Sequence, residues 1–287
     1  MKKIKVGGVP EHFNLPWHLC MEEGDFRYEG IDLEWVEFPD GTGAMNKALR
    51  NKEIDVAIIL TEGIVKDISA GNPSRIIQSY IETPLIWGIH VDANAPFQNV
   101  KDLEGTTAAI SREGSGSQLM AYVNAANEGW DINGLKFEIT GDIHGAAEAL
   151  KNNEAQYFMW EKYTTKPWVD KGLFRKVGEC PTPWSCFVVA AREEFIRENE
   201  HDLAKMLGVV NAKSASFKEI PDIESTLSSR YGIRIEDIVT WLNITAWSQH
   251  QLPAEELVKV QETLEMLELI PAHLPASQFL YDLDVPI

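Results

Sequence analysis

A short turn of small polar residues carries the sharpest chemical signal in the chain. It reads Ser111-Arg112-Glu113-Gly114-Ser115-Gly116-Ser117 and stands directly before a stretch with helical periodicity. Glycines let a backbone turn tightly, and the amides and hydroxyls at a helix start can hold an anion. We interpret the turn as a site for a carboxylate, sulfonate or small phosphate, with Arg112 as the counter-charge. The alternative is an ordinary helix cap with Arg112 on the surface.

Two glutamates follow apolar runs at nearly equivalent places in the chain. Glu62 comes after Ile54 to Leu60, and Glu161 after Ala155 to Trp160. Either carboxylate is suited to accept a hydrogen bond from an amine or ring nitrogen, or to act as a base. Exposed loop glutamates without such a role are the equally weighted alternative.

Histidines and aromatic residues add further candidates. His12 and His144 are able to carry protons near neutral pH, but no serine or cysteine stands in a nucleophile motif, so we assign no catalytic residue. Trp17 and Trp160 are expected to stack on a planar ligand, and core packing is the alternative for each. His18 and Cys20 near His12 make a poor metal set, so we expect no metal and no cofactor.

One rule selects the candidate residues, namely that ligands lie beyond the carboxyl ends of strands in open parallel sheets. The turn at Ser111 lacks the glycine spacing of a dinucleotide fingerprint and the Gly-Lys-Ser/Thr ending of a phosphate-binding loop. The complete set of predicted ligand-binding residues is His12, Phe13, Trp17, Asp40, Thr42, Thr61, Glu62, Ser111, Arg112, Ser115, Gly116, Ser117, His144, Trp160 and Glu161.

The elements that must position these residues occur twice. The segment from Ala48 to Val56 returns as Ala149 to Tyr157, 101 positions later, and the same offset relates the strand-like segments Lys5 to Val9 and Thr106 to Ile110. Each copy predicts a β-α-β-α-β unit, and helices dominate from Glu193 onward. We therefore expect an α/β fold of two similar open lobes with a cleft between them and a helical C-terminal tail. Lobe I would comprise residues 1–90 and 192–287, and lobe II residues 91–191.

Composition narrows the classes of function. The 287 residues are 44% hydrophobic and 24% charged, as in an ordinary globular protein. A net charge of -18 disfavours binding to nucleic acid and to anionic membranes, and no apolar run is long enough for membrane insertion. Met1-Lys2-Lys3 leads at once into a strand, so we expect no signal peptide and a cytoplasmic location, with three reduced cysteines.

The layout resembles the type II periplasmic-binding-protein fold, and within it the group of sulfonate, nitrate and taurine receptors and thiamine-pyrimidine synthases. The resemblance rests on the first strand and its loop, on Ala48 to Ala57, and on Val100-Lys101-Asp102-Leu103-Glu104-Gly105 before the second copy. It implies two lobes joined by crossing strands near Trp87 to Val91 and Phe187 to Ala191, with ligand trapped by hinge closure. The cysteine-rich iron segment and cofactor-binding lysine of the synthases have no match here.

We expect a cytoplasmic protein that binds a small, anionic and partly planar metabolite between its lobes and that is not an enzyme. The alternative is an enzyme on the same scaffold, acting on a small heterocyclic or carboxylate substrate by analogy with thiamine-pyrimidine or menaquinone-precursor enzymes. A periplasmic location with delivery to an ABC permease would require a leader before Met1.

Overall fold

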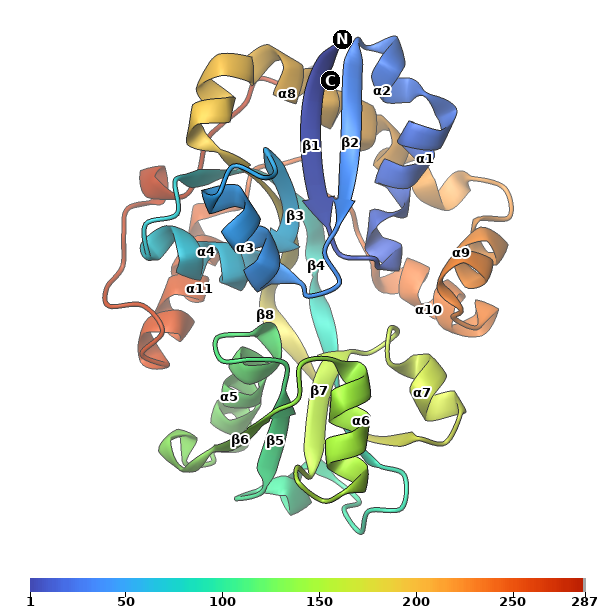
Figure 1. Cartoon of the computed structure of the whole chain (residues 1–287), viewed down its shortest axis with the longest axis vertical. Helices are drawn as coiled ribbons and strands as arrows, with labels where there is room; N and C mark the ends of the chain where they lie inside the picture. Colours follow the sequence, from blue (N-terminus) through green and yellow to red (C-terminus); the bar gives the residue numbers. More distant parts are fainter. Residues whose placement is uncertain (286–287) are drawn as a thin grey trace. The chain divides into compact units, whose positions relative to one another are not determined.

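The computed structural model describes residues 1–285, which form two compact units. The first unit contains Met1–Pro84 and the chain from Pro183 onward, and the second contains Leu85–Thr182. Two long strands, β4 (Ser74–Asp92) and β8 (Phe174–Arg192), carry the chain from one unit into the other (Figure 1). The boundaries expected from the sequence, after residues 90 and 191, lie on the same two strands.

The first unit is built on a sheet with the strand order β2-β1-β3-β8. Strands β1 (Lys2–Gly8), β2 (Ile31–Glu37) and β3 (Val56–Leu60) are parallel, and β8 runs antiparallel to β3. The apolar run of β3 is almost fully buried, as expected for a parallel strand covered on both faces. The helices between these strands are η1 (His12–Asn14), α1 (Leu15–Glu23), α2 (Asp25–Tyr28), α3 (Thr42–Arg50) and α4 (Thr61–Ser69).

The helical tail belongs to the first unit, where α11 (Ala254–Met266) packs against α4 and α8 (Glu193–Ala215) packs against α1. Its longest helix, α8, has a break in helical geometry at Asn199. The tail consists of α8 (Glu193–Ala215), η4 (Phe217–Glu219), α9 (Ile223–Tyr231), α10 (Ile235–Ile244), α11 (Ala254–Met266) and η5 (Ala276–Gln278).

The second unit repeats the same sheet arrangement with the order β6-β5-β7-β4. Three of its strands are parallel and β4 is antiparallel to β7, which matches the place of β8 beside β3. The elements are η2 (Val100–Leu103), β5 (Thr107–Ile110), α5 (Gly116–Glu128), η3 (Ile132–Gly134), β6 (Lys136–Ile139), α6 (Ile143–Lys151), β7 (Tyr157–Glu161) and α7 (Lys166–Asp170).

The repeated sequence segment has the same geometry in both units. Helices α3 and α6 are each nine residues long and begin 101 positions apart. Each is followed by a non-glycine residue with positive φ, Lys52 at 61° and Asn153 at 59°. The next amide then returns to the helix, with Glu53 N donating to Ala48 O and Glu154 N to Ala149 O, both at 2.9 Å. The repeated sequence segment is therefore also a repeat in the structure.

A side chain ties the third strand of each unit to the first. Asp55 Oδ2 accepts from Lys5 N at 3.0 Å, and Gln156 Oε1 accepts from Thr107 N at 2.9 Å. In return, Asp55 N donates to Lys5 O and Gln156 N to Thr107 O. Lys5 thus corresponds to Thr107, an offset of 102, whereas the sequence alignment paired it with Thr106. The pairing shifts by one because 50 positions separate Lys5 from Asp55, whereas 49 separate Thr107 from Gln156.

The two long strands run further than local sequence indicates. Arg75 to Tyr80 and Leu85 to Val91 are strand-like segments separated by Thr83-Pro84, yet both belong to the continuous strand β4. Pro84 does not end the strand because the fixed φ of proline is compatible with extended backbone. Likewise, the apolar stretch Ser185 to Ala191 is only the second half of β8.

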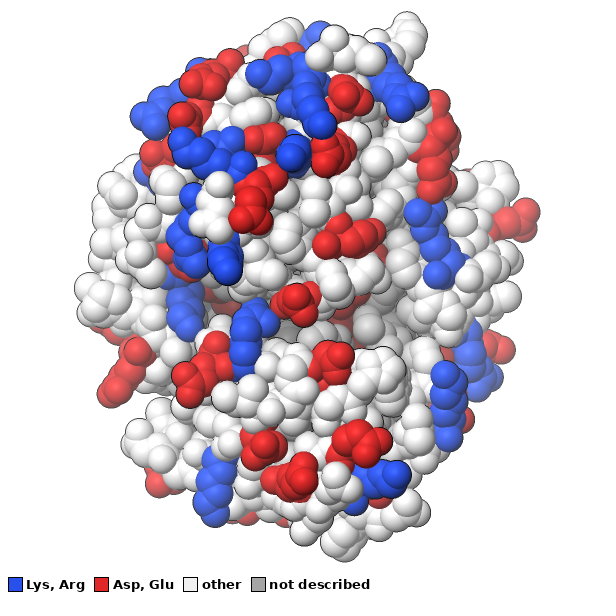
Figure 2. All heavy atoms as spheres, in the orientation of Figure 1, with Lys and Arg blue, Asp and Glu red and all other residues white. Residues whose placement is uncertain are grey.

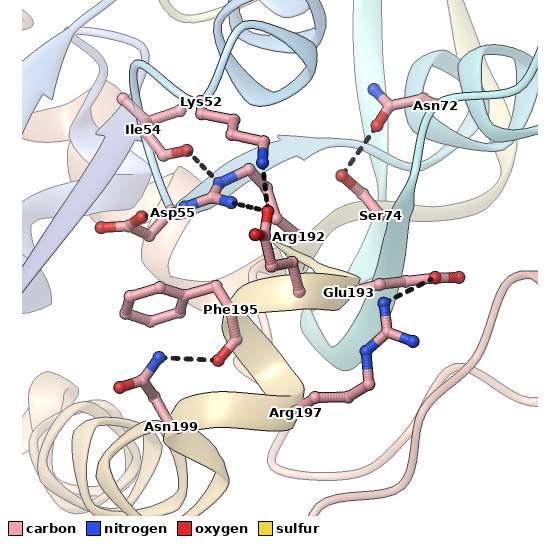
Figure 3. Close-up of polar contacts among 11 residues, drawn as sticks. Lys52, Ile54, Asp55, Asn72, Ser74, Arg192, Glu193, Phe195, Arg197 and Asn199 are labelled. Carbon is pink, nitrogen blue, oxygen red and sulfur yellow. Dashed lines mark hydrogen bonds and ion pairs between the residues drawn. The ribbon is translucent and has the colours of Figure 1, made fainter.

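A cluster of ion pairs joins β3, β8 and the start of α8 in the first unit (Figure 3). The guanidinium of Arg192 donates to Asp55 Oδ1 at 2.6 Å and to Ile54 O at 3.1 Å. Glu194 pairs with Lys52 and lies 3.6 Å from Arg192. On the face of the molecule drawn in Figure 2, acidic and basic side chains are interspersed.

We expect Arg192→Met to lower the free energy of unfolding by about 2 kcal/mol, because Asp55 would lose the cation beside its partly buried carboxylate. The two side chains are 11% and 15% exposed. Urea unfolding of the variant checks this value. Arg197 serves as the control, since it is 70% exposed and lies 3.8 Å from Glu193, so Arg197→Met is expected to cost at most about 0.5 kcal/mol. Equal losses in both variants would contradict the role given to Arg192.

Candidate functional site

The first unit gathers most of its predicted residues at one edge of its sheet. Because β1, β2 and β3 are parallel, their carboxyl ends meet there, and Phe38 N donates to Gly8 O across the ends of β2 and β1. The loop after β1 carries His12 and Phe13, the turn after β2 carries Asp40 and Thr42, and the start of α4 carries Thr61 and Glu62.

Glu62 is the most unusual group at this edge. Its side chain is buried, with Oε2 accepting from Trp184 Nε1 at 2.8 Å. The other oxygen, Oε1, has no hydrogen-bond partner among residues 1–285. Burial raises the pKa of Glu62 from 4.5 to about 7, and the backbone amide of Glu62 and the indole of Trp184 only partly oppose that shift. The carboxyl group therefore retains an unused hydrogen-bonding position in a desolvated place.

The surroundings of Glu62 are held by hydrogen bonds to β8. Thr61 Oγ1 donates to Ser185 O at 2.6 Å, and Ser185 Oγ donates to Glu82 O at 3.1 Å. Ser185 N donates to the carboxylate of Glu256 on α11. These bonds fix the backbone beside Trp184, so the indole that contacts Glu62 is positioned by both β8 and the tail.

His12 and Phe13 lie in an aromatic cluster. Phe13 is 5.2 Å from both Phe187 and Trp241 between ring centroids, and His12 is 4.4 Å from Trp241. Burial lowers the pKa of His12 to about 3, which keeps the imidazole neutral at physiological pH. The sequence reasoning did not select Trp241, because it lies on a tail helix that follows no strand of the sheet.

Trp17 and Thr42 take packing positions. Trp17 is fully buried and stacks on Phe26 at 5.9 Å, with Tyr80 and Trp35 close by, as the core-packing alternative expected. Thr42 at the start of α3 packs on Gly63, where an added Cβ would stand 2.2 Å from Thr42 Cγ2. Asp40 is exposed in the turn before α3.

The second unit also brings its predicted loops to one sheet edge. Strands β5, β6 and β7 are parallel, and Thr140 N and Gly141 N donate to Ile110 O and Ser111 O at 2.8 and 3.1 Å. The loop after β5 therefore lies beside the loop after β6. Asp142 caps α6 by accepting from His144 N and Gly145 N, both at 2.9 Å. The ring of His144 lies 4.9 Å from Trp168, edge to face.

The serines of the predicted anion turn are joined to one another. Ser115 caps α5 by accepting from Gln118 N at 3.4 Å, and its hydroxyl is 3.0 Å from that of Ser117. Ser117 Oγ also accepts from Ser111 N at 3.1 Å. Gly116 is the first residue of α5, so its amide has no acceptor within the helix. The turn thus includes the predicted cap, and the anion site at Arg112 stays a prediction.

Glu161, at the end of β7, is buried like Glu62 but has a different partner. Its Oε2 accepts from Thr164 N at 2.6 Å, and burial raises its pKa to about 7. Trp160 beside it is half-buried, stacked on Phe158 at 5.4 Å. Within residues 1–285, no group of three His, Cys, Asp or Glu side chains is placed to hold a metal ion. No helix of this part is long and apolar enough to cross a membrane.

Comparison with known proteins assigns the fold. Residues 87–180 match a family model described as "Ca3427-like PBP". The Candida albicans CA3427 gene product, whose structure exhibits the periplasmic binding protein fold, is 23% identical, with a TM-score of 0.90 over 100% of this chain and 98% of that one. The resemblance inferred from the sequence is confirmed, and the chain has the α/β type II periplasmic-binding-protein fold.

Other similar proteins are sulfonate-binding proteins. The alkanesulfonate-binding protein SsuA of Xanthomonas axonopodis pv. citri, bound to MOPS, is 14% identical with a TM-score of 0.82 over 98% of this chain and 99% of that one. The Bacillus subtilis "Putative aliphatic sulfonates-binding protein" is 24% identical over 268 residues, which are 91% of this chain and 79% of that protein. The chain is thus related to a group of small-molecule-binding proteins.

The buried acid makes a testable contribution to stability. Because the folded-state pKa of Glu62 is raised from 4.5 to about 7, the folded protein binds more protons than the unfolded chain between these values, and stability falls as pH rises through this window. Glu62→Gln keeps an acceptor for Trp184 and removes the titration. We expect the variant to match the wild type at pH 4 and to exceed it at pH 8 by on the order of 2–3 kcal/mol.

Urea unfolding of both proteins from pH 4 to pH 8 measures this effect. Glu161→Gln is the matched control. It should remove the pH dependence of stability that comes from Glu161, the second buried acid, and leave that of Glu62 in place. Parallel stability curves for wild type and Glu62→Gln would show that the Glu62 carboxyl does not titrate in this window.

Proposed function

We propose that this protein binds a small organic anion, with sulfonates as the leading class. The observation that carries the presence of a ligand site is the buried Glu62 carboxyl group, with one oxygen unpartnered among residues 1–285, at the sheet edge where open α/β sheets bind ligands. The relation to sulfonate-binding proteins supports the choice of anion. The cleft between lobes and the hinge closure expected from the sequence belong to this proposal.

Each unit contributes a different chemical group to the proposed ligand. The turn from Ser111 to Ser117 offers amides at the start of α5 and the cation of Arg112 for the anionic end. Glu62 offers an acceptor, or a donor when protonated, for a polar group elsewhere on the ligand. Phe13 and Trp160 suit an apolar or planar portion. Glu161, Thr61, His12, Asp40, Thr42 and His144 stay predicted contributors, as does Trp17 despite its core position.

An enzyme on the same scaffold is the second candidate. It is favoured by the pKa values of Glu62 and Glu161, both raised to about 7 by burial, which suit proton transfer near neutral pH. Turnover that is lost in Glu62→Gln while binding persists would favour the enzyme. Binding without turnover in the wild type favours the carrier. We also propose a cytoplasmic location, in which thiols such as those of the buried Cys20 and Cys180 stay reduced.

The first test analyses what the protein carries. Purified protein is denatured and the released small molecules are identified by mass spectrometry, with a mock purification as control. We expect one stoichiometric small acid, with a sulfonate as the leading outcome. Release of a cationic compound alone would contradict the anion proposal, and a substrate and product pair would favour the enzyme.

Arg112→Ala is expected to weaken binding of the identified acid about 10- to 100-fold, because a charge-assisted hydrogen bond to the anion would be lost. Calorimetric titration measures the change. Lys171→Ala, which removes an exposed cation of the same unit, should leave the affinity unchanged. Unchanged affinity in Arg112→Ala would remove the anion site from this turn.

A further inference from the structure

The tail of the first unit places two side chains against the loop after β1. Trp241 on α10 lies edge to face with His12 at 4.4 Å, and Tyr231 at the end of α9 lies 6.1 Å from the same ring. Trp241 is 1% exposed and His12 is also 1% exposed. We call His12, Tyr231 and Trp241 the tail cluster.

The tail cluster contains polar atoms that the rest of the structure does not satisfy. Trp241 Nε1 and the hydroxyl of Tyr231 are both buried atoms without a hydrogen-bond partner among residues 1–285. An indole N–H can only donate, whereas a phenol can donate or accept. Leaving such groups unpaired in the interior is unfavourable, and each calls for a partner. Neither donor forms a hydrogen bond with residues 1–285, so an acceptor atom on a bound ligand is a suitable partner for both.

The tail cluster is uncharged at neutral pH. Burial holds the pKa of His12 at about 3, so the imidazole is neutral, and it raises the pKa of Tyr231 to about 12, so the phenol keeps its proton. The charged groups that act on Tyr231 are Arg230 and three acids, Glu37, Glu22 and Glu11. Arg230 itself is paired with Glu22 at 2.7 Å. Neutral donors beside a surplus of acids suit an uncharged oxygen acceptor better than an anion.

The tail cluster is continuous with the edge that carries Glu62. Phe13 contacts Trp241 on one side and Phe187 on the other, at 5.2 Å each. Phe187 is paired with Leu60, which immediately precedes Thr61 and Glu62. The edge therefore has a carboxyl group at one end, phenyl rings between, and neutral donors at the other.

We propose that the tail cluster is a second polar subsite, in which Trp241 Nε1–H and the Tyr231 hydroxyl donate to an uncharged ether, hydroxyl or carbonyl oxygen of the ligand. This inference rests on the proposed function, since it assigns one end of the same organic anion. It makes the helical tail a determinant of specificity.

Two sulfonates that differ in one ring position test the inference at mildly acidic pH, where both ring amines are protonated and the two compounds carry the same charge. MOPS has a ring oxygen, and 3-(piperidin-1-yl)propane-1-sulfonate has a methylene group in its place. We expect the wild type to bind MOPS about three- to tenfold more tightly than the piperidine compound, which corresponds to the binding free energy of one neutral hydrogen bond. Trp241→Phe should lose that preference. Tyr231→Phe, which removes only a hydroxyl, should reduce it. Trp130→Phe in the second unit is the control and should retain it.

Calorimetry gives the affinities, and the indole N–H resonance of Trp241, assigned by its absence in Trp241→Phe, gives a direct readout that should shift with MOPS. Thermal unfolding checks that each variant is folded. If both sulfonates bind the wild type equally, or if the preference survives in Trp241→Phe and Tyr231→Phe, the tail subsite is wrong and the proposed function stands. If neither sulfonate binds, the sulfonate class fails and the inference fails with it.

Discussion

The tie between the third strand and the first is the constraint on which each unit depends. In both units the residue just before the third strand uses its side chain and its amide to hold the first strand in register. Register determines where parallel strands end, and their ends determine where the loops with functional side chains lie. The first unit adds Arg192, whose guanidinium ties the same point to β8 (Figure 3). In the second unit, Gln156 is neutral and bonds back to Asn153 instead.

Much of this arrangement follows from local sequence. Continuous apolar runs predict the buried strands, and the segment from Ala48 to Val56 and its copy predict the repeat, because helix, left-handed turn and strand are all local features. The sequence comparison paired Lys5 with Thr106 instead of Thr107. This one-residue error arises because a one-residue difference in length between repeated elements cannot be located from local sequence patterns. Proline often ends a strand, yet extended backbone accommodates Pro84 within β4.

The sequence predicted which loops carry the candidate residues, but it did not predict where their side chains point. The rule about carboxyl ends placed Glu62 and Glu161 correctly at the sheet edges, but it says nothing about the direction of a side chain. Trp17 follows β1 as the rule requires, yet it lies in the first turn of α1 and packs against Phe26 and Tyr80. Trp241 and Trp184 reach the first-unit edge from the tail and from β8. Contacts between distant segments of this kind depend on the assembled fold.

An acidic protein can still bind an anion, because the two effects act at different distances. A net charge of -18 is spread over the surface, and salt screens it within about 8–10 Å at physiological ionic strength. Its principal effect is therefore on the rate of encounter. Hydrogen-bond donors in a desolvated site act at contact, where the low local dielectric strengthens them. The donors proposed for the ligand are helix amides, hydroxyls, one indole and one arginine, and most of them carry no net charge. Selectivity would then come from donors fixed in place by the fold, and the surface charge would mainly keep the protein from nonspecific contact with other polyanions.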